Sequence, residues 1–499
     1  MTDIGGQVIV TLVMFVITPI IVQLTSPLLY GFWVASLSVL GYLGLVDFGL
    51  SVALTRMVAG LSNSKDDLEE LNHAASSAFF SFCGMSAIFL IAGLWVSPHI
   101  PMWFRIPPVH AGMVVRAFQL VILAGAVGIP LSIFEAIVAG HQRMVVANVA
   151  RYAVALTGAG MSVGLLYAGY GLMALALSNF FVGIAGGAVN FFFARRYCPS
   201  LNIKPSMVTK AHVARLWSFG GHFQMGRIAN TVATNTDSII IAAMLGAAMV
   251  TPYVLTARLA VLFSISIASR APIAVFPMLS QMFALRETEK LQRAFMMLAQ
   301  YSTRLALVGG VFLAVANRQF VSLWVGPGFF GGSLLNMVFV YWVLQDTFYR
   351  GTAGMVYASG DLRHWAWASL AEAVVNIMAS LLLVGPLGLV GVALGTSIGR
   401  TFTTGIYIPY WMCRKVELPV KYFLWKGIGS PVLRSLPGMG VAVACSMLLP
   451  ENLGWVWILA VGSVALITNI ISFEGVWLAR PSDLPWSSRW RQLMVLSAH

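Results

Sequence analysis

Long apolar runs, separated by short polar breaks, are the feature that most constrains the fold of this chain. A membrane-spanning helix needs about 20 mainly apolar residues, and such runs follow one another along almost all of the 499 residues. Charged residues make up only 9% of the sequence, whereas a soluble domain carries roughly 25%. So few charges do not cover the surface of a soluble protein of this length. The sequence therefore predicts an all-α polytopic membrane protein.

The apolar runs predict about fourteen transmembrane helices. The predicted spans are 4–24, 30–59, 74–97, 111–139, 149–168, 171–193, 216–245, 251–280, 296–316, 333–359, 366–385, 388–410, 431–449 and 454–474. An even number of spans places both termini on the same side of the membrane.

The basic residues between the spans indicate which side that is. With a cytoplasmic N-terminus, nineteen Lys and Arg residues fall in cytoplasmic breaks and only three in the opposite ones. Cytoplasmic loops of membrane proteins carry such an excess, so we expect both termini in the cytoplasm. The net charge of +13 follows this topology and does not indicate nucleic-acid binding.

The remaining charges lie inside the predicted spans. Eight are arginines: Arg56, Arg227, Arg258, Arg270, Arg304, Arg350, Arg400 and Arg434. Five are acids, which we regard as candidates for ion coupling or charge pairing: Asp47, Glu135, Asp237, Asp346 and Glu372. A charge at the centre of the bilayer costs at least about 2.5 kcal/mol on insertion scales, so these side chains need a polar interior or a partner.

Six of the arginines are candidates for a cationic substrate cavity. Arg56 and Arg434 lie near span ends, where long basic side chains reach the interface. The deeper candidates are Arg227, Arg258, Arg270, Arg304, Arg350 and Arg400. A guanidinium group stays charged in a low dielectric and binds phosphate through two hydrogen bonds. Such a cavity suits an anionic phosphate or diphosphate headgroup better than a cationic drug.

Spacing distinguishes some of these arginines. Asp346 and Arg350 are four residues apart, which places them on neighbouring turns of a helix and allows a local ion pair. A structural pair and a cavity-lining role both remain open there. Arg258 and Arg270 share a span that contains no acid, which favours a cavity-lining role for both.

No catalytic motif stands out in the sequence. Gly395–Gly399 matches the GxSxG pattern of hydrolases, but Gly391, Gly395 and Gly399 repeat every four residues, which is typical of close helix packing. No Walker A motif, HExxH motif or metal-spaced His/Cys cluster is present, and the four cysteines are expected to be free thiols. We therefore expect a transporter without cofactor or metal, not an enzyme.

Two similar stretches indicate an internal repeat. A proline shortly before a tyrosine follows span one at Pro27 and Tyr30, and again follows span seven at Pro252 and Tyr253. This predicts two six-helix lobes with the substrate between them. The predicted divisions are an N-terminal lobe at 1–196, a C-terminal lobe at 197–412, two additional spans at 413–474 and a cytoplasmic tail at 475–499.

Several short motifs resemble one family. They are residues 46–51 (VDFGLS), 236–240 (TDSII), 257–259 (ARL) and 277–280 (PMLS). In this order they resemble the polysaccharide transporter or Wzx-type oligosaccharide flippases of the multidrug/oligosaccharidyl-lipid/polysaccharide exporter superfamily.

The resemblance implies a V-shaped bundle with a central cationic cavity, in which Asp47 and Arg258 are functional positions. It implies that a polyprenyl-diphosphate-linked oligosaccharide is flipped across the bacterial inner membrane by alternating access. Membrane lipid and the proteins of glycan polymerisation and export are then the expected partners. Span one contains no charge between Gly5 and Leu24, which argues against lipid II as the substrate.

Two other functions remain open from the sequence. An ion-coupled multidrug exporter of the same superfamily would need acids to dominate the cavity, but arginines outnumber acids eight to five within the spans. An intramembrane glycan polymerase or ligase usually carries a large periplasmic loop, and the predicted outer loops are short.

Overall fold

The computed structural model describes residues 2–42, 50–60, 65–141, 144–217, 221–268, 270–448 and 454–477. Every regular element in these ranges is a helix. The described part of each of the fourteen predicted spans falls on one helix or on successive helices. Eight of the described helices are long and apolar enough to cross a membrane, and five shorter ones are apolar. The predicted fold class, an all-α polytopic membrane protein, is confirmed.

The chain divides into two compact units, and unit 1 comprises residues 1–255, 324–331 and 362–403. Its helices are α1 (Thr2–Thr25), α2 (Pro27–Gly41), α4 (Leu50–Gly60), α5 (Lys65–Val96), α6 (Ile100–Trp103), α7 (Pro108–Gly140), α8 (Met144–Tyr167), α9 (Leu172–Tyr197), α10 (Lys210–Trp217), α11 (Gly221–Met244), α16 (Arg363–Leu387) and α17 (Leu389–Arg400). Short 3₁₀ turns lie at Ser97–His99, Pro205–Met207, Ala247–Met249 and Pro327–Phe329.

Unit 2 comprises residues 256–323, 332–361 and 404–499. Its helices are α13 (Arg270–Ala284), α14 (Thr288–Trp324), α15 (Ser333–Ala358), α18 (Ile408–Lys415), α19 (Val420–Tyr422), α20 (Ser430–Leu448) and α21 (Trp455–Trp477). Helix α12 (Val250–Leu262) begins in unit 1 and continues into unit 2. The lobe boundaries expected from the internal repeat stay a prediction.

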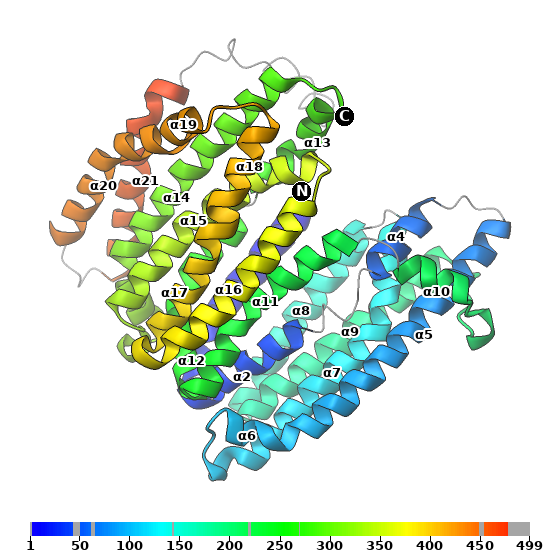
Figure 1. The fold of residues 1–499 in the computed structure, drawn as a ribbon. Coiled ribbons are helices and arrows are strands. Elements are labelled where there is room, and N and C mark those ends of the chain that lie inside the picture. Colours follow the sequence, from blue (N-terminus) through cyan, green and yellow to red (C-terminus); the bar gives the residue numbers. More distant parts are fainter. Residues whose placement is uncertain are drawn as a thin grey trace. The chain divides into compact units, whose positions relative to one another are not determined.

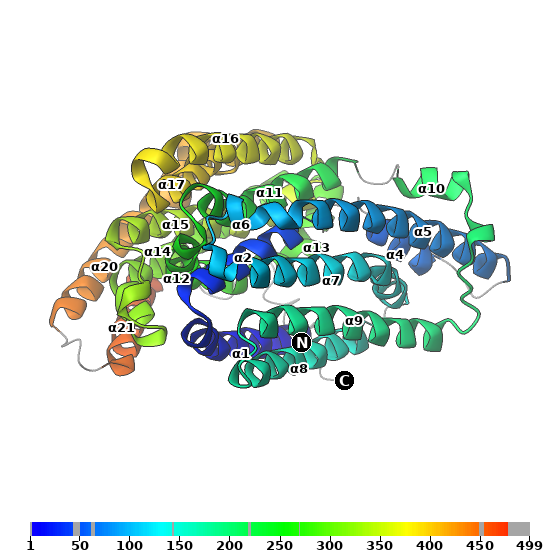
Figure 2. The same cartoon turned by 90° about the horizontal axis from the view of Figure 1, so that it is seen from below.

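Apolar side chains hold α4, α5, α7 and the end of α9 together in unit 1. Leu50 and Leu54 of α4, Phe82 of α5, and Ile133 and Ile137 of α7 are all buried in one cluster. Figures 1 and 2 both show α5, α7 and α9 running side by side. These helices are apolar on several faces because lipid replaces water as the solvent.

Glycines allow a close contact between α16 and α17 in unit 1. A Cβ atom at Gly391 would lie 2.1 Å from the Leu383 carbonyl oxygen, and one at Gly395 would lie 2.2 Å from Ser380 Oγ. A Cβ atom at Gly399 would lie 2.8 Å from the Glu372 carbonyl oxygen. The glycine repeat of α17 therefore faces α16, as the four-residue spacing predicts.

Three spans contain a π-helical segment, in which the backbone is wider than in an α-helix. These segments are η4 (Phe263–Ala268), η6 (Thr401–Tyr407) and η7 (Phe423–Gly429). Such segments occur frequently at functional sites. Segment η4 directly continues the helix that carries Arg258, and η6 begins directly after Arg400.

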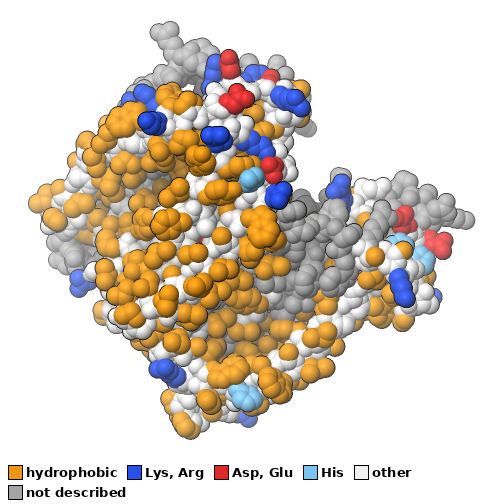
Figure 3. All heavy atoms as spheres, viewed as in Figure 1, with side chains coloured by type: hydrophobic (Ala, Val, Ile, Leu, Met, Phe, Trp, Pro, Cys, Tyr) orange, Lys and Arg blue, Asp and Glu red, His pale blue; other side chains and the backbone are white. Residues whose placement is uncertain are grey.

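The surface agrees with a lipid environment. Hydrophobic side chains cover most of the described surface on the face drawn in Figure 3, and Lys and Arg side chains lie mainly toward its edges. Large apolar side chains such as Ile88, Ile91 and Leu382 are about 70% exposed or more. In water such a surface would favour aggregation, whereas in a bilayer it contacts acyl chains.

The glycine contact between α16 and α17 generates a stability prediction. The change Gly395→Ala places a methyl group against the backbone of Ser380, where Cβ would lie 2.5 Å from the Ser380 nitrogen. Overpacking of this kind costs roughly 1–3 kcal/mol, so we expect a lower unfolding temperature for the purified protein. The control is Gly164→Ala in α8, where a Cβ atom meets nothing within 4 Å. An equal unfolding temperature for both variants would contradict the packing.

Candidate functional site

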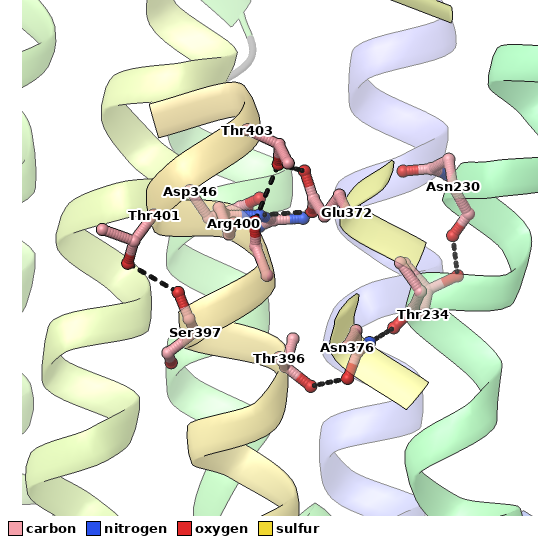
Figure 4. Close-up of polar contacts among 12 residues, drawn as sticks. Asn230, Thr234, Asp346, Glu372, Asn376, Thr396, Ser397, Arg400, Thr401 and Thr403 are labelled. Atoms are coloured by element: carbon pink, nitrogen blue, oxygen red, sulfur yellow. Dashed lines mark hydrogen bonds and ion pairs between the residues drawn. The ribbon is translucent and has the colours of Figure 1, made fainter. Parts of the chain in front are cut away.

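A buried ion pair joins α16 to α17 in unit 1. Arg400 Nε lies 3.0 Å from Glu372 Oε1, and each side chain is only 6% exposed. Thr403 Oγ1 donates to the other carboxylate oxygen, Glu372 Oε2, at 3.3 Å. Figure 4 shows the three side chains converging. Because both charges are compensated within the unit, this arginine serves to hold two helices together.

A second ion pair lies in unit 2, where the four-residue spacing predicted it. Arg350 Nε lies 2.6 Å from Asp346 Oδ2, and the Asp346 side chain is fully buried. Ser264, in the π-helical segment η4, also donates to Asp346. The carboxylate of α15 therefore binds both its own helix and η4, and it fixes the position of that irregular segment.

Asp237 differs from the other described acids within the spans, because its hydrogen bonds come from neutral hydroxyl groups. Tyr253 OH donates to Asp237 Oδ2 at 2.7 Å. Thr396 Oγ1 lies 2.9 Å from Asp237 Oδ2 and 3.1 Å from Oδ1. These contacts join α11, α12 and α17 within unit 1.

More oxygen atoms lie within hydrogen-bonding distance of Thr396 Oγ1 than its single hydroxyl hydrogen can serve. Besides the carboxylate, Thr396 Oγ1 lies 3.1 Å from Asn376 Oδ1 (Figure 4) and 3.4 Å from the Val392 carbonyl oxygen. Ser380 Oγ lies 3.1 Å from the same Asn376 Oδ1 and 3.2 Å from the same carbonyl. A hydroxyl group donates one hydrogen bond, so several of these oxygens face each other as acceptors. A proton or a cation would satisfy them.

The fourth described acid within the spans, Glu135, has a looser partner. Arg151 Nη1 of α8 lies 3.8 Å from Glu135 Oε1 of α7, and both side chains are about half exposed. An exposed pair of this kind contributes roughly 0–1 kcal/mol. Arg151 also donates from Nη2 to Asn148 Oδ1 of its own helix at 2.5 Å.

Arg258 is the candidate arginine that remains available. It lies on α12, its side chain is partly buried, and it makes no hydrogen bond or ion pair with a residue that the structure describes. Asn317 of α14 donates to the Thr256 carbonyl oxygen at 2.9 Å, and Ser264 anchors the same span further along. The backbone that carries Arg258 is therefore fixed on both sides of it.

The remaining candidate residues reveal less about a binding site. Arg304 of α14 has its Nε atom buried, and Arg434 of α20 lies close enough to repel it electrostatically. The side chains of Arg227 and Arg270 lie outside the part of the chain that the structure describes, and so does Asp47. Their expected roles stay predictions.

Sequence reasoning missed most of the Asp237 cluster. Tyr253 belongs to the predicted internal repeat, but no spacing rule joins Asp237 to Thr396, which lies 159 residues away. The available signal was the polar content of α16 and α17. Asn376, Ser380 and Thr396 stand in otherwise apolar runs, where polar residues usually mark helix contacts or functional sites.

Comparisons with known proteins agree with this geometry. A family model described as "Polysaccharide biosynthesis protein" matches residues 3–283. The "Putative O-antigen transporter" of Shigella flexneri is 21% identical over 377 residues, which cover 74% of this chain and 86% of that protein.

Two solved structures show the same fold. The lipid II flippase MurJ, in an inward closed conformation, has a TM-score of 0.69 at 15% identity, covering 94% of this chain and 98% of that chain. A multidrug resistance MATE family transporter of the MOP superfamily, in an inward-facing conformation, has a TM-score of 0.59 at 14% identity. The match covers 82% of this chain and 98% of that chain. At these identities the likeness concerns the fold alone.

The ion pair between α16 and α17 predicts a non-additive effect on stability. Removing one partner of a buried pair costs about 3–5 kcal/mol, because the other charge stays buried without compensation. We expect Arg400→Gln to destabilise the purified protein strongly, and Glu372→Gln with Arg400→Gln together to destabilise it less than the two single effects added. Thermal unfolding of the three variants measures this. Strictly additive effects would show that the two side chains do not interact.

Proposed function

Because the chain belongs to the polysaccharide biosynthesis protein family, we propose that it is a flippase for a polyprenyl-diphosphate-linked oligosaccharide. It moves this lipid from the cytoplasmic to the periplasmic leaflet of the bacterial inner membrane by alternating access. The relative described as an O-antigen transporter supports this substrate class. The fold that the chain shares with a lipid II flippase supports the mechanism class.

Arg258 is the observation that carries the proposal. A guanidinium group within a span is costly unless it has a partner, and Arg258 has none among the described residues. Its backbone is held by Asn317 and, through η4, by Asp346. A guanidinium group on an anchored backbone, without a partner among the described residues, suits a substrate that brings its own negative charge. A diphosphate accepts two hydrogen bonds from such a group in one plane.

Arg350 and Arg400 are not part of this proposed binding set, because each is paired with an acid of its own unit. We keep Arg227, Arg270 and Arg304 as further candidates for contact with the diphosphate. In this proposal the prenyl chain stays in lipid while polar side chains pass the sugars. Both termini face the cytoplasm, as the distribution of Lys and Arg favours, and glycan polymerisation and export proteins act on the product.

Asp237 is the acid that best fits ion coupling. Its carboxylate lies among the hydroxyl, amide and carbonyl oxygens of Thr396, Asn376 and Val392. Oxygens of these kinds bind hard cations, and a proton on the carboxylate would equally supply the missing donor. We propose that the transported coupling ion, a proton or a cation, binds Asp237 and links its gradient to the conformational change.

A multidrug exporter shares the fold, but neither of the two buried ion pairs nor Arg258 favours a cationic substrate. An intramembrane glycan polymerase or ligase has no support in the comparisons.

Arg258→Ala tests the proposed binding role. Hydrogen bonds to charged groups contribute about 1.5–3 kcal/mol each, so we expect export of the glycan to fall at least about tenfold. Arg258→Lys keeps the charge but loses the planar fork, and we expect an intermediate level. Surface polysaccharide is measured in cells that contain only the variant, together with its amount in the membrane. Arg318→Ala, an exposed residue on α14, serves as the control. Normal polysaccharide with Arg258→Ala would contradict the role.

Asp237→Asn tests the coupling role. The amide keeps the size of the side chain but carries no charge, so we expect flipping to lose its dependence on an imposed proton or cation gradient. The matched control is Asp361→Asn, because Asp361 is an exposed residue paired with Lys415 at 3.2 Å. Flipping by both variants is measured in proteoliposomes with and without each gradient. An unchanged gradient dependence in Asp237→Asn would exclude this acid as the coupling site.

A further inference from the structure

Unit 1 contains a cavity that the proposed transport path does not use. It has a volume of about 230 Å³ and lies among α7, α8 and α9. Its polar lining residues are Ser132, Glu135, Arg151 and Asn190, and small or branched apolar residues such as Gly128, Val182 and Gly186 form the remainder. Engineered apolar cavities of roughly 150 Å³ already bind benzene, so this space is large enough for part of an acyl chain.

The missing side chains of two glycines leave much of this space open. A Cβ atom at Gly128 or at Gly186 would meet nothing within 4 Å. By contrast, a Cβ atom at Gly187 would lie 2.3 Å from a Leu131 methyl carbon. Gly187 therefore serves helix packing, whereas Gly128 and Gly186 leave room.

The polar and apolar ends of the cavity are arranged along the membrane normal. Glu135 lies five residues before the end of α7, Arg151 seven residues after the start of α8, and Asn190 seven residues before the end of α9. In the proposed orientation these helix ends are cytoplasmic. From Glu135 the lining continues to Gly128, which at 1.5 Å per residue is about 10 Å deeper. The polar end thus faces the headgroup level of the cytoplasmic leaflet, and the apolar end points toward the centre of the bilayer.

The charges at the polar end select the kind of headgroup. Arg151 suits a phosphate, and Glu135, 3.8 Å away, suits a positive charge close to that phosphate. A diphosphate or phosphatidylglycerol offers no positive group to Glu135 and is repelled by it. A choline headgroup is positive but has no N–H group to donate to the carboxylate. A primary ammonium group beside a phosphate satisfies both side chains.

We propose that this cavity binds phosphatidylethanolamine from the cytoplasmic leaflet. Arg151 binds the lipid phosphate, Glu135 accepts hydrogen bonds from its ammonium group, and one acyl chain enters the space beside Gly128 and Gly186. The exposed Glu135–Arg151 pair contributes only roughly 0–1 kcal/mol, so opening it to admit the lipid costs little. The bound lipid fills a gap between three helices of unit 1 that the protein itself leaves open.

Native mass spectrometry of the purified full-length protein tests this proposal. Phosphatidylethanolamine, phosphatidylcholine and phosphatidylglycerol with identical acyl chains are added at equal concentration. One charge-assisted hydrogen bond is expected to give phosphatidylethanolamine about a tenfold preference over phosphatidylcholine. Glu135→Gln should remove this preference and leave the protein folded, because the side chain is about half exposed.

Gly186→Leu fills the cavity and should lower retention of phosphatidylethanolamine to the level of phosphatidylcholine. The matched control is Gly160→Leu on α8, where a Cβ atom also meets nothing within 4 Å but which does not line the cavity. No preference in the parent protein, or a preference that Glu135→Gln leaves unchanged, would overturn the proposal. Displacement of the lipid by equimolar polyprenyl diphosphate would also overturn it, because the cavity would then belong to the transport path.

Discussion

The cost of placing a charge inside a bilayer is the constraint on which the rest of this structure depends. An uncompensated charge within a span is expensive, so each described acid in the spans lies beside a donor. Glu372 and Asp346 bind arginines at 3.0 Å and 2.6 Å, while Asp237 accepts hydrogen bonds from hydroxyl groups. These contacts join largely apolar helices, and they help to fix which helices are neighbours within each unit.

The same constraint separates structural from functional arginines. The charges of Arg350 and Arg400 are compensated by acids of their own units, and these ion pairs stabilise the fold. Arg258 has a fixed backbone and no charged partner among the described residues, so its compensation must come from elsewhere. In the proposed function, the diphosphate group of the substrate provides that compensation during transport. The π-helical segment η4, which Asp346 holds through Ser264, begins at Phe263 and places an irregular backbone about one helical turn after Arg258.

The sequence predicted those features that depend on local spacing. Apolar runs located the helices, the spacing of four located the Asp346–Arg350 pair, and the glycine repeat located the close face of α17. Contacts between distant segments were not predictable in this way. Arg400 and Glu372 are 28 residues apart and meet only because α16 and α17 turn back on each other. The cluster around Asp237 needs four helices at once, and no periodicity in one segment contains that information. The π-helical segments follow from tertiary packing as well.

The central claim is that this protein moves a lipid-linked oligosaccharide between leaflets. Its most direct test is a flipping assay with the purified protein in proteoliposomes that contain a polyprenyl-diphosphate-linked oligosaccharide. A membrane-impermeant enzyme that modifies sugars reports how much substrate reaches the outer leaflet. The account predicts that, in liposomes with the protein and an imposed ion gradient, the enzyme modifies more of the lipid-linked oligosaccharide than the outer leaflet holds at the start. A modified fraction equal to that of protein-free liposomes, with correctly folded protein and each gradient tested, would contradict it.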